Sequence, residues 1–276
     1  MMIMKRFLWL AVSAFILVGC GRKTAESTDG TNGGSAVGDT LVAGEPAPPT
    51  PIAADHLFDD FFFSFCSNPE LQSQRVVFPL PVYDAEGTRL QMEREQWNND
   101  PFFIEDGYYT VIFDTPAQME AARDTSLTRA VVERINLDAD FVSQYLFSKE
   151  DNCWMLTAIQ HQAMSDNHNA SFLTFYQRFA ADSTFQEKSL SPRVKFTTTD
   201  PDDEFSTISG TMVPAQWDTF RPAIIPQETI YNIVYGQPAP EGKTKYFIIR
   251  GVSDDMESQM LFRKSENGWK LTAFTN

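Results

Sequence analysis

Two segments of the chain show the apolar spacing of a helix packed on a core. Apolar side chains at i, i+3, i+4 and i+7 share one helix face, and both segments follow that pattern with aromatic residues. The first set is Phe58, Phe61, Phe62 and Phe65, and the second is Phe172, Phe175, Tyr176 and Phe179. Each segment therefore predicts an amphipathic helix with a phenylalanine-rich buried face.

After each helix the apolar positions change to the runs and alternation that predict β-strands. The first half is expected to hold strands at residues 75–83, 107–113, 129–137, 141–148 and 154–160. The second half is expected to hold strands at residues 193–199, 204–212, 229–236, 245–252, 258–264 and 269–275. Asn267-Gly268, between the last two, is the signature of a two-residue type I′ hairpin. A leading helix laid over a curved antiparallel sheet is an α+β arrangement.

The two halves repeat one another. SQYLFSKEDNCWMLTAIQ (143–160) and SQMLFRKSENGWKLTAFT (258–275) match at ten of eighteen positions, without a gap, at an offset of 115. The two aromatic helices correspond at an offset of 114. Solenoid repeats are about 20–50 residues long, so this period predicts duplication of a complete domain. We expect a first domain at residues 55–162 and a second at residues 169–276.

The N-terminus predicts export and lipid attachment. A basic stretch precedes an apolar run at residues 8–18, which is shorter than the roughly 20 residues that span a bilayer but fits a signal peptide. The run ends at Leu17-Val18-Gly19-Cys20, which resembles the bacterial lipobox, where a small residue precedes an acylated cysteine. We expect residues 1–19 to be a signal peptide and acyl chains on Cys20 to anchor the chain to a membrane. A short membrane anchor, or a secretory signal with a chance cysteine, is the alternative.

Residues 20–54 are expected to form a disordered tether. The segment is poor in large apolar residues and rich in Gly, Ser, Thr, Ala and Pro, so it cannot bury enough surface to offset chain entropy.

Charge narrows the classes of partner. The chain has 22 Lys and Arg against 37 Asp and Glu, and loss of two basic residues with the signal peptide gives 20 − 37 = −17. Such a chain repels nucleic acid and anionic membrane surfaces. The acids are scattered, which indicates solvated surface. The densest group, at residues 200–204, lacks the spacing of a calcium loop, so we expect no metal site.

No catalytic motif is present in the sequence. His56, His161 and His168 lie outside the strands expected to line a cavity. Asp114 and Glu133 are the carboxylates nearest to strand interiors, and we expect both at strand ends or on solvent faces. No Ser-His-Asp order, Walker loop or HExxH motif occurs. We therefore predict no catalytic residue and no cofactor.

The order of elements resembles the nuclear transport factor 2-like (cystatin-like) superfamily, whose conical sheet wraps an N-terminal helix and leaves a cavity. The resemblance rests on the Phe-rich first helix and on the closing hairpin LF-x-K-x-x-N-x-W-x-LTA, at residues 146–158 and 261–273. The chain also resembles a family of uncharacterised Bacteroides-type lipoproteins with that fold. This implies two tandem copies of the fold and supplies no catalytic residue. Asp39-Thr40-Leu41 matches the O-glycosylation pattern of that group, which makes Thr40 a candidate modification site.

Three features leave alternatives open. Gln144 and Gln259 are identical across the repeat, so they either bond a ligand in each cavity or satisfy backbone groups, and the second is favoured. Phe63 has no aromatic counterpart and packs on the other domain or on a partner. Cys66 and Cys153 are both missing from the second copy, which favours a disulfide. Against it, Cys153 corresponds to Gly268, where a type I′ turn would need a positive φ.

Together these features predict a lipid-anchored envelope protein that acts as a non-catalytic ligand-binding or protein-interaction module. Its expected partner is an envelope protein or a small apolar ligand. The alternatives are a cavity enzyme of the isomerase or hydratase type and a structural subunit of an envelope complex. Gly21-Arg22-Lys23 lacks the acidic run that surface-exported lipoproteins of the resembled group carry, so we expect the periplasmic face of the outer membrane.

Overall fold

The structure, a computed structural model, describes residues 49–200 and 202–276. The expected signal peptide, Cys20, Thr40 and most of the expected tether lie outside the described residues. Within these residues, none of the helices combines the length and the apolar character needed to traverse a bilayer. Residues 49–54 were expected in the tether, but they lie against the folded part, where Arg75 donates to the Thr50 carbonyl at 2.6 Å.

The first half is a helical segment followed by six strands. Its elements are η1 (Ala53–His56), α1 (Phe58–Ser67), α2 (Pro69–Gln74), β1 (Leu80–Tyr83), β2 (Arg89–Met92), η2 (Arg94–Gln96), β3 (Tyr108–Phe113), α3 (Pro116–Glu120), η3 (Ala121–Arg123), β4 (Arg129–Asn136), β5 (Phe141–Glu150) and β6 (Cys153–Ala163).

The second half has the same order of helices and strands at its start and end, but it has an α-helix before its third strand and no helical element after that strand. Its elements are η4 (Met164–Asp166), α4 (Ala170–Ala181), α5 (Ser183–Lys188), β7 (Leu190–Asp200), β8 (Asp203–Met212), η5 (Pro214–Gln216), α6 (Trp217–Phe220), β9 (Thr229–Tyr235), β10 (Thr244–Gly251), β11 (Glu257–Ser265) and β12 (Gly268–Thr275).

Each long helix breaks at the same point because a capping residue starts a new helix there. The Asn68 carboxamide accepts from the backbone N–H groups of Glu70 and Leu71, and Pro69 occupies the first turn of α2. In the second half, Asp182 accepts from the backbone of Phe185 and starts α5. The break sends the chain from the helix into the sheet at equivalent places in the two halves.

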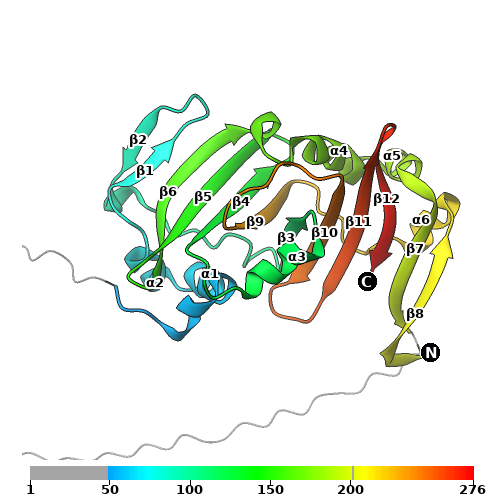
Figure 1. The fold of residues 1–276 in the computed structure, drawn as a ribbon, viewed down its shortest axis with the longest axis horizontal. Helices are drawn as coiled ribbons and strands as arrows, with labels where there is room; N and C mark the ends of the chain where they lie inside the picture. The colour runs from blue at the N-terminus through cyan, green and yellow to red at the C-terminus, as the bar shows by residue number, and fades with distance from the viewer. Residues whose placement is uncertain (1–48, 201) are drawn as a thin grey trace, which may run out of the picture. The chain divides into compact units, whose positions relative to one another are not determined.

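The strands form two six-stranded sheets with corresponding orders (Figure 1). One is β2-β1-β6-β5-β4-β9, and the other is β8-β7-β12-β11-β10-β3. The third strand of each half therefore lies at the edge of the other half's sheet. β9 pairs with β4, with Asn232 opposite Glu133, and β3 pairs with β10, with Val111 opposite Ile248. The halves are interlocked by a reciprocal exchange of strands.

The exchanged strands also bond to each other and complete the cores. The Thr110 hydroxyl donates to the Tyr231 carbonyl at 2.6 Å, and the Tyr231 amide donates back to that hydroxyl at 2.8 Å. The core around α1 contains Ile233 of β9, and the core around α4 contains Ile112 of β3. Burying such a side chain is worth about 1.5–3 kcal/mol, so each half is stabilised by strands of the other.

The expected α+β fold, a helix on a curved sheet present twice, is confirmed, and the aromatic faces of both helices lie in the cores. Three details differ. The pairs β1–β6 and β7–β12 are parallel, while the remaining strand pairs are antiparallel. The strand expected at 75–83 begins only at Leu80, because α2 extends to Gln74, and β2 was not expected.

The closing hairpins differ from the expected turn. In the second half Gly268 has φ +93°, but neither residue before it has a positive φ, so the turn is not type I′. In the first half Asp151 and Asn152 have φ values of +48° and +64°, which is the type I′ pattern. Asn and Asp tolerate this region better than most residues, so Cys153 is free to begin β6 in an extended conformation.

Candidate functional site

Two neighbouring residues at the centre of β4 organise two polar clusters. Glu133 and Arg134 point to opposite faces of the sheet, as successive strand residues do. Both clusters include residues of β9, the strand that comes from the other half. We call them the Glu133 cluster and the Arg134 cleft.

The Glu133 cluster is built around a fully buried carboxylate. Glu133 accepts from Gln144 at 2.8 Å, from Asn167 at 2.7 Å and from Asn232 at 2.8 Å. The His168 Nδ1 atom lies 3.7 Å from the same carboxylate. A buried charge needs such donors because it has lost its water. Both carboxylate oxygens of Glu133 thus accept from side chains of the protein itself.

Two of the amides around Glu133, those of Asn167 and Asn232, cannot flip without losing other hydrogen bonds. Asn232 Oδ1 accepts from the backbone N–H of Ile112 at 2.9 Å, and Asn167 Oδ1 accepts from that of Asn169 at 2.8 Å. These bonds orient both NH₂ groups toward the carboxylate. The cluster therefore links β4, β9, β3 and the start of α4 in one network.

A buried lysine extends the network. Lys245 of β10 is fully buried and bonds to both Asp114 and Asn169. The second oxygen of Asp114 accepts from the Gly242 backbone at 2.9 Å. Gln118 accepts from the Asp114 backbone at 2.5 Å. Every charged group of this cluster is thus engaged by another residue of the chain.

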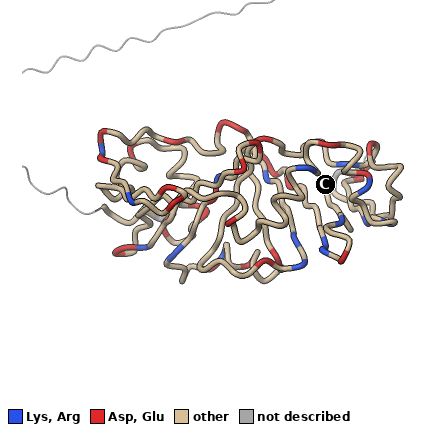
Figure 2. The backbone as a smooth tube through the Cα atoms, turned by 90° about the horizontal axis from the view of Figure 1, so that it is seen from above, with Lys and Arg blue, Asp and Glu red and all other residues tan. Residues whose placement is uncertain are grey.

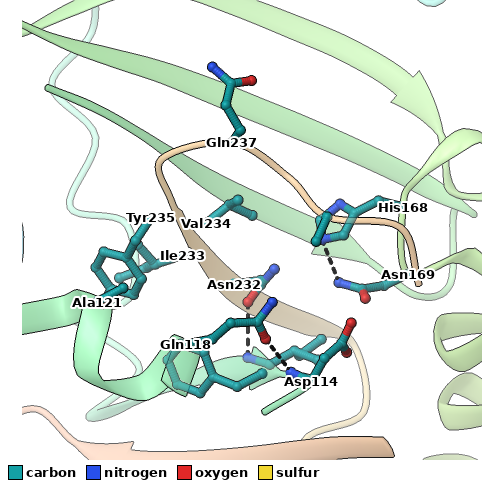
Figure 3. A pocket seen from close by; sticks show the side chains of 13 residues that line it. Asp114, Gln118, Ala121, His168, Asn169, Asn232, Ile233, Val234, Tyr235 and Gln237 are labelled. Carbon is teal, nitrogen blue, oxygen red and sulfur yellow. Dashed lines mark hydrogen bonds between the residues drawn. The ribbon is translucent and has the colours of Figure 1, made fainter. Parts of the chain in front are cut away.

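A small pocket lies beside the cluster (Figure 3). Asp114, Gln118, His168, Asn169 and Asn232 line it, and Asn169 contacts the His168 ring at 2.9 Å. Its volume is about 60 Å³. One water needs roughly 10–15 Å³ by this measure, so the pocket has room for a few waters and is far below the roughly 300–1,000 Å³ of small-molecule sites.

The Glu133 cluster is present at only one of the two equivalent places. At the repeat offset of 115, Glu133 corresponds to Ile248 and Lys245 corresponds to Ala130. Ile248 lies in the apolar core around α1. The pairing of β4 with the exchanged strand β9 is therefore polar at this point, where Glu133 faces Asn232. The equivalent pairing of β10 with β3 is apolar, because Ile248 faces Val111. The polar side chains of the Glu133 cluster bond one another, so we interpret the cluster as a structural network that fixes how the two halves pack.

On the opposite face of β4, Arg134 is held by three partners. It donates to the Tyr231 hydroxyl at 2.9 Å, to the Tyr145 hydroxyl at 3.1 Å and to Asp100 at 2.6 Å. Its guanidinium carbon lies 5.1–5.6 Å from the ring centroids of Phe102, Tyr145 and Tyr231. Such cation–π contacts and the planar fork restrict the guanidinium to one orientation.

Asp100 is fixed in turn by the segment that carries it. Buried Gln72 of α2 accepts from the Asp100 amide at 2.7 Å and donates to its carbonyl at 2.9 Å. The Asp100 carboxylate also accepts from the Phe102 amide at 2.8 Å. Phe102 has φ +52°, which is costly for a bulky residue. Strained backbone of this kind is concentrated at binding and catalytic sites.

The protonation states follow from burial. Burial raises the pKa of Tyr231 to about 12, against the opposing effect of Arg134, and burial likewise raises the pKa of Tyr145. Burial alone would lower the pKa of Arg134, but the hydrogen bond to Asp100 and the nearby tyrosines raise that pKa above its ordinary value. At neutral pH the site thus presents neutral hydroxyls and a charged guanidinium.

These residues open into a cleft of about 560 Å³, within the range of small-molecule sites. Arg134, Tyr231 and Phe102 line it together with Tyr108. One wall is formed by residues 225–229, and the exposed Asp106, just before β3, also lines the cleft. The cleft is therefore built from both halves.

Comparison with known proteins places the chain in a family. Residues 38–276 match a family described as a domain of unknown function, DUF4348. The chain belongs to this family. A crystal structure of an NTF2-like protein from Bacteroides fragilis is similar, with a TM-score of 0.74 and 38% sequence identity. The match covers 82% of this chain and 98% of that one. No protein with a curated function matches the chain.

In this DUF4348 chain the two repeat-related glutamines have different surroundings. Gln144 bonds to Glu133, whereas Gln259 is half-buried on β11 opposite Ile248 and makes no side-chain hydrogen bond within the described residues. Neither lines the Arg134 cleft. Phe63 packs on Phe103 and on Tyr109 of the exchanged strand β3, at 5.4 Å in each case.

The expected Cys66–Cys153 disulfide is wrong: both thiols are buried and free. Phe58, at the start of α1, lies 5.0 Å from the Trp154 ring, next to Cys153. Cys66 is eight residues further on, about 12 Å along the helix axis. A disulfide needs Cα atoms within about 7 Å. Cys153 instead donates to the Pro49 carbonyl at 3.4 Å.

The carboxylate predictions were half right. Asp114 follows the end of β3, as expected, but Glu133 is fully buried and not on a solvent face. His168 lies outside the strands, as expected, but it lines the small pocket. His161 was expected beyond the strand, but it lies on β6, which extends to Ala163. Sequence reasoning missed Arg134 and Asp100 entirely. The repeat does indicate that Glu133 is buried, because its counterpart at the offset of 115 is the apolar Ile248.

Proposed function

We propose that this chain is a lipid-anchored envelope protein that binds a small molecule in the Arg134 cleft without converting it chemically. The observation that carries this proposal is the fixed guanidinium of Arg134 in a cleft of suitable volume. Arginine has five N–H donors, and three are used by Tyr231, Tyr145 and Asp100. Two remain for a ligand, on a group that is already oriented and so loses little entropy on binding.

The same residues favour binding over catalysis. An isomerase or hydratase needs a group that exchanges protons near neutral pH. Asp100 is committed to Arg134, and the pKa values of Tyr145 and Tyr231 are raised by burial. No histidine lines the cleft within the described residues. The nearest histidine–carboxylate pair, His168 and Glu133, is on the opposite face of the sheet.

The anchoring is proposed from sequence. A basic stretch, an apolar run and the lipobox-like Cys20 support export and acylation, and Gly21-Arg22-Lys23 supports the periplasmic face of the outer membrane. Replacing Cys20 with Ser should release the protein from the membrane fraction. Sedimentation of that variant with membranes, signal peptide still attached, would contradict the anchor. The ancestry of the chain, as duplicated domains at 55–162 and 169–276, is likewise a proposal.

A protein-interaction role is the second candidate, and strand β8 favours it. β8 is the outermost strand of its sheet, and Phe205 on it is 91% exposed. An exposed sheet edge offers unpaired backbone groups to another chain. Loss of a copurifying envelope protein in a Phe205→Ser variant, with retention in Leu90→Ser at the edge of the other sheet, would support this role.

Retention of a cell-extract molecule tests the binding proposal. The full-length protein, purified in detergent, is incubated with a polar extract of its host, washed and analysed by mass spectrometry. We expect a retained molecule that Thr229→Trp, which fills the Arg134 cleft, abolishes. Thr184→Trp, which fills a different surface cleft, is the matched control and should retain it. Equal retention by Thr229→Trp would contradict the proposal.

A further inference from the structure

We propose that the molecule held in the Arg134 cleft is uncharged and rich in hydroxyl groups, which is the chemistry of a carbohydrate. This inference rests on the proposed function and adds the class of ligand. It follows from the arrangement of donors and acceptors around the cleft, from its charge and from its apolar wall.

The cleft offers donors at its floor and acceptors at its rim. The two remaining N–H groups of Arg134 donate only, because a guanidinium has no acceptor. Asp106 and Glu228 line the cleft as exposed carboxylates that only accept. Gln227 and Thr229, on the same wall, do both. A single small ligand must therefore both accept and donate, and hydroxyl groups do so at every position.

The charges disfavour simple ions. An anion that approached Arg134 would compete with Asp100, which already pairs with it at 2.6 Å, and would pass Asp106 and Glu228. These two carboxylates lie close enough to Tyr108 to add to the effect of burial in raising its pKa. A cation would meet the guanidinium at the floor. Acidic residues are also spread over the coloured part of the backbone in Figure 2, and the net charge of the chain is negative, so the surrounding field repels anions.

The apolar wall of the Arg134 cleft also suits a sugar ring. Ile225 and Pro226 form part of one wall, and the Pro226 carbonyl is anchored by the Tyr176 hydroxyl at 3.1 Å. Phe102 and Tyr231 add aromatic surface beside Arg134. A sugar ring carries C–H faces as well as hydroxyl edges. An ion or a free amino acid would leave most of this wall without a partner.

The test compares named probes on the full-length protein in detergent, by isothermal titration calorimetry. The probes are soluble gluco-, xylo- and chito-oligosaccharides, with glycine and dialanine as zwitterions and acetate as an anion. We expect saturable binding of at least one oligosaccharide, with little change between low and high salt, and none for the other probes. Arg134→Lys should weaken binding about tenfold or more, since a bond to a charged donor is lost.

Control variants keep the test informative if Arg134→Lys misfolds. Glu228→Gln preserves size but turns one acceptor into a donor, and it should weaken oligosaccharide binding several-fold. Asp218→Asn, in the cleft that Thr184 lines, should not. Salt-dependent binding of dialanine or acetate, with no oligosaccharide bound, would overturn the ligand class and leave the proposed function standing. If no oligosaccharide binds and the host extract also yields nothing, both fail.

Discussion

Changing Glu133 to Gln tests whether the buried carboxylate fixes the packing of the two halves. The carboxylate accepts three amide bonds, and the orientations of Asn167 and Asn232 are set by their bonds to backbone N–H groups. A glutamine has one acceptor oxygen, so its NH₂ must face a donor on one side. An unsatisfied buried donor costs about 1–3 kcal/mol, and the surviving bonds lose their charge assistance.

Removing the charge also has a gain, because a fully buried carboxylate has lost its hydration. We therefore expect Glu133→Gln to lower the free energy of unfolding by a net ~2 kcal/mol. The measurement is guanidinium chloride denaturation followed by tryptophan fluorescence. Glu150→Gln, the same change at an exposed position on β5, should lie within about 0.5 kcal/mol of the wild type.

The sharper version of this experiment adds Asn232→Asp. Alone, that change places two buried carboxylates against each other and should destabilise the fold by more than Glu133→Gln does. In the double variant, the new amide at position 133 donates to the new carboxylate at position 232, which still accepts from the Ile112 backbone. Glu133→Gln should therefore stabilise the protein in the Asn232→Asp background. Additive effects of the two changes would refute the bonding scheme.

Two further predictions follow from the packing of the halves. Burial raises the pKa of Asp59 above its ordinary 3.8, so the folded chain keeps a proton that the unfolded chain loses, and stability falls as pH rises from about 4 through the raised value. Asp59→Asn still accepts from Tyr235 and should remove this fall, as unfolding measured across that range will show. For the strand exchange, cysteines replacing Val131 and Val234, which are register partners on β4 and β9, should cross-link on oxidation. Cysteines replacing Val131 and Phe113 should not cross-link. Phe113 pairs with Tyr246 of β10, which corresponds to Val131 of β4 at the repeat offset of 115. Phe113 would therefore face Val131 if β3 paired with β4 in its own half.

Local patterns predicted most of the fold because they depend on neighbours in the chain. The spacing of Phe58 to Phe65 and the alternation in the strands record which faces are buried, and the repeat at an offset of 115 revealed two similar halves. β2 was missed because it has only four residues and is mostly exposed, so the alternation of Leu90 and Met92 is too short to predict a strand. The helix breaks at Asn68 and Asp182 come from capping residues, which the apolar pattern does not record.

The site was not predictable by the same means, because strand exchange is a choice between two nearly equivalent pairings. β3 and β9 have similar patterns, so periodicity cannot say which sheet each joins. The clusters at Glu133 and Arg134 exist only once that choice is made, since both include residues of β9. The distance between Cys66 and Cys153 likewise depends on how α1 lies on the sheet, and not on their shared absence from the second half.

A crystal structure of the protein with its retained molecule is the most direct test of ligand binding in the Arg134 cleft. We expect the molecule to lie within hydrogen-bonding distance of the Arg134 guanidinium and against Pro226, with hydroxyl groups facing Asp106 and Glu228. A molecule bound elsewhere on the chain, or a cleft that stays empty when the protein is saturated in solution, would contradict it.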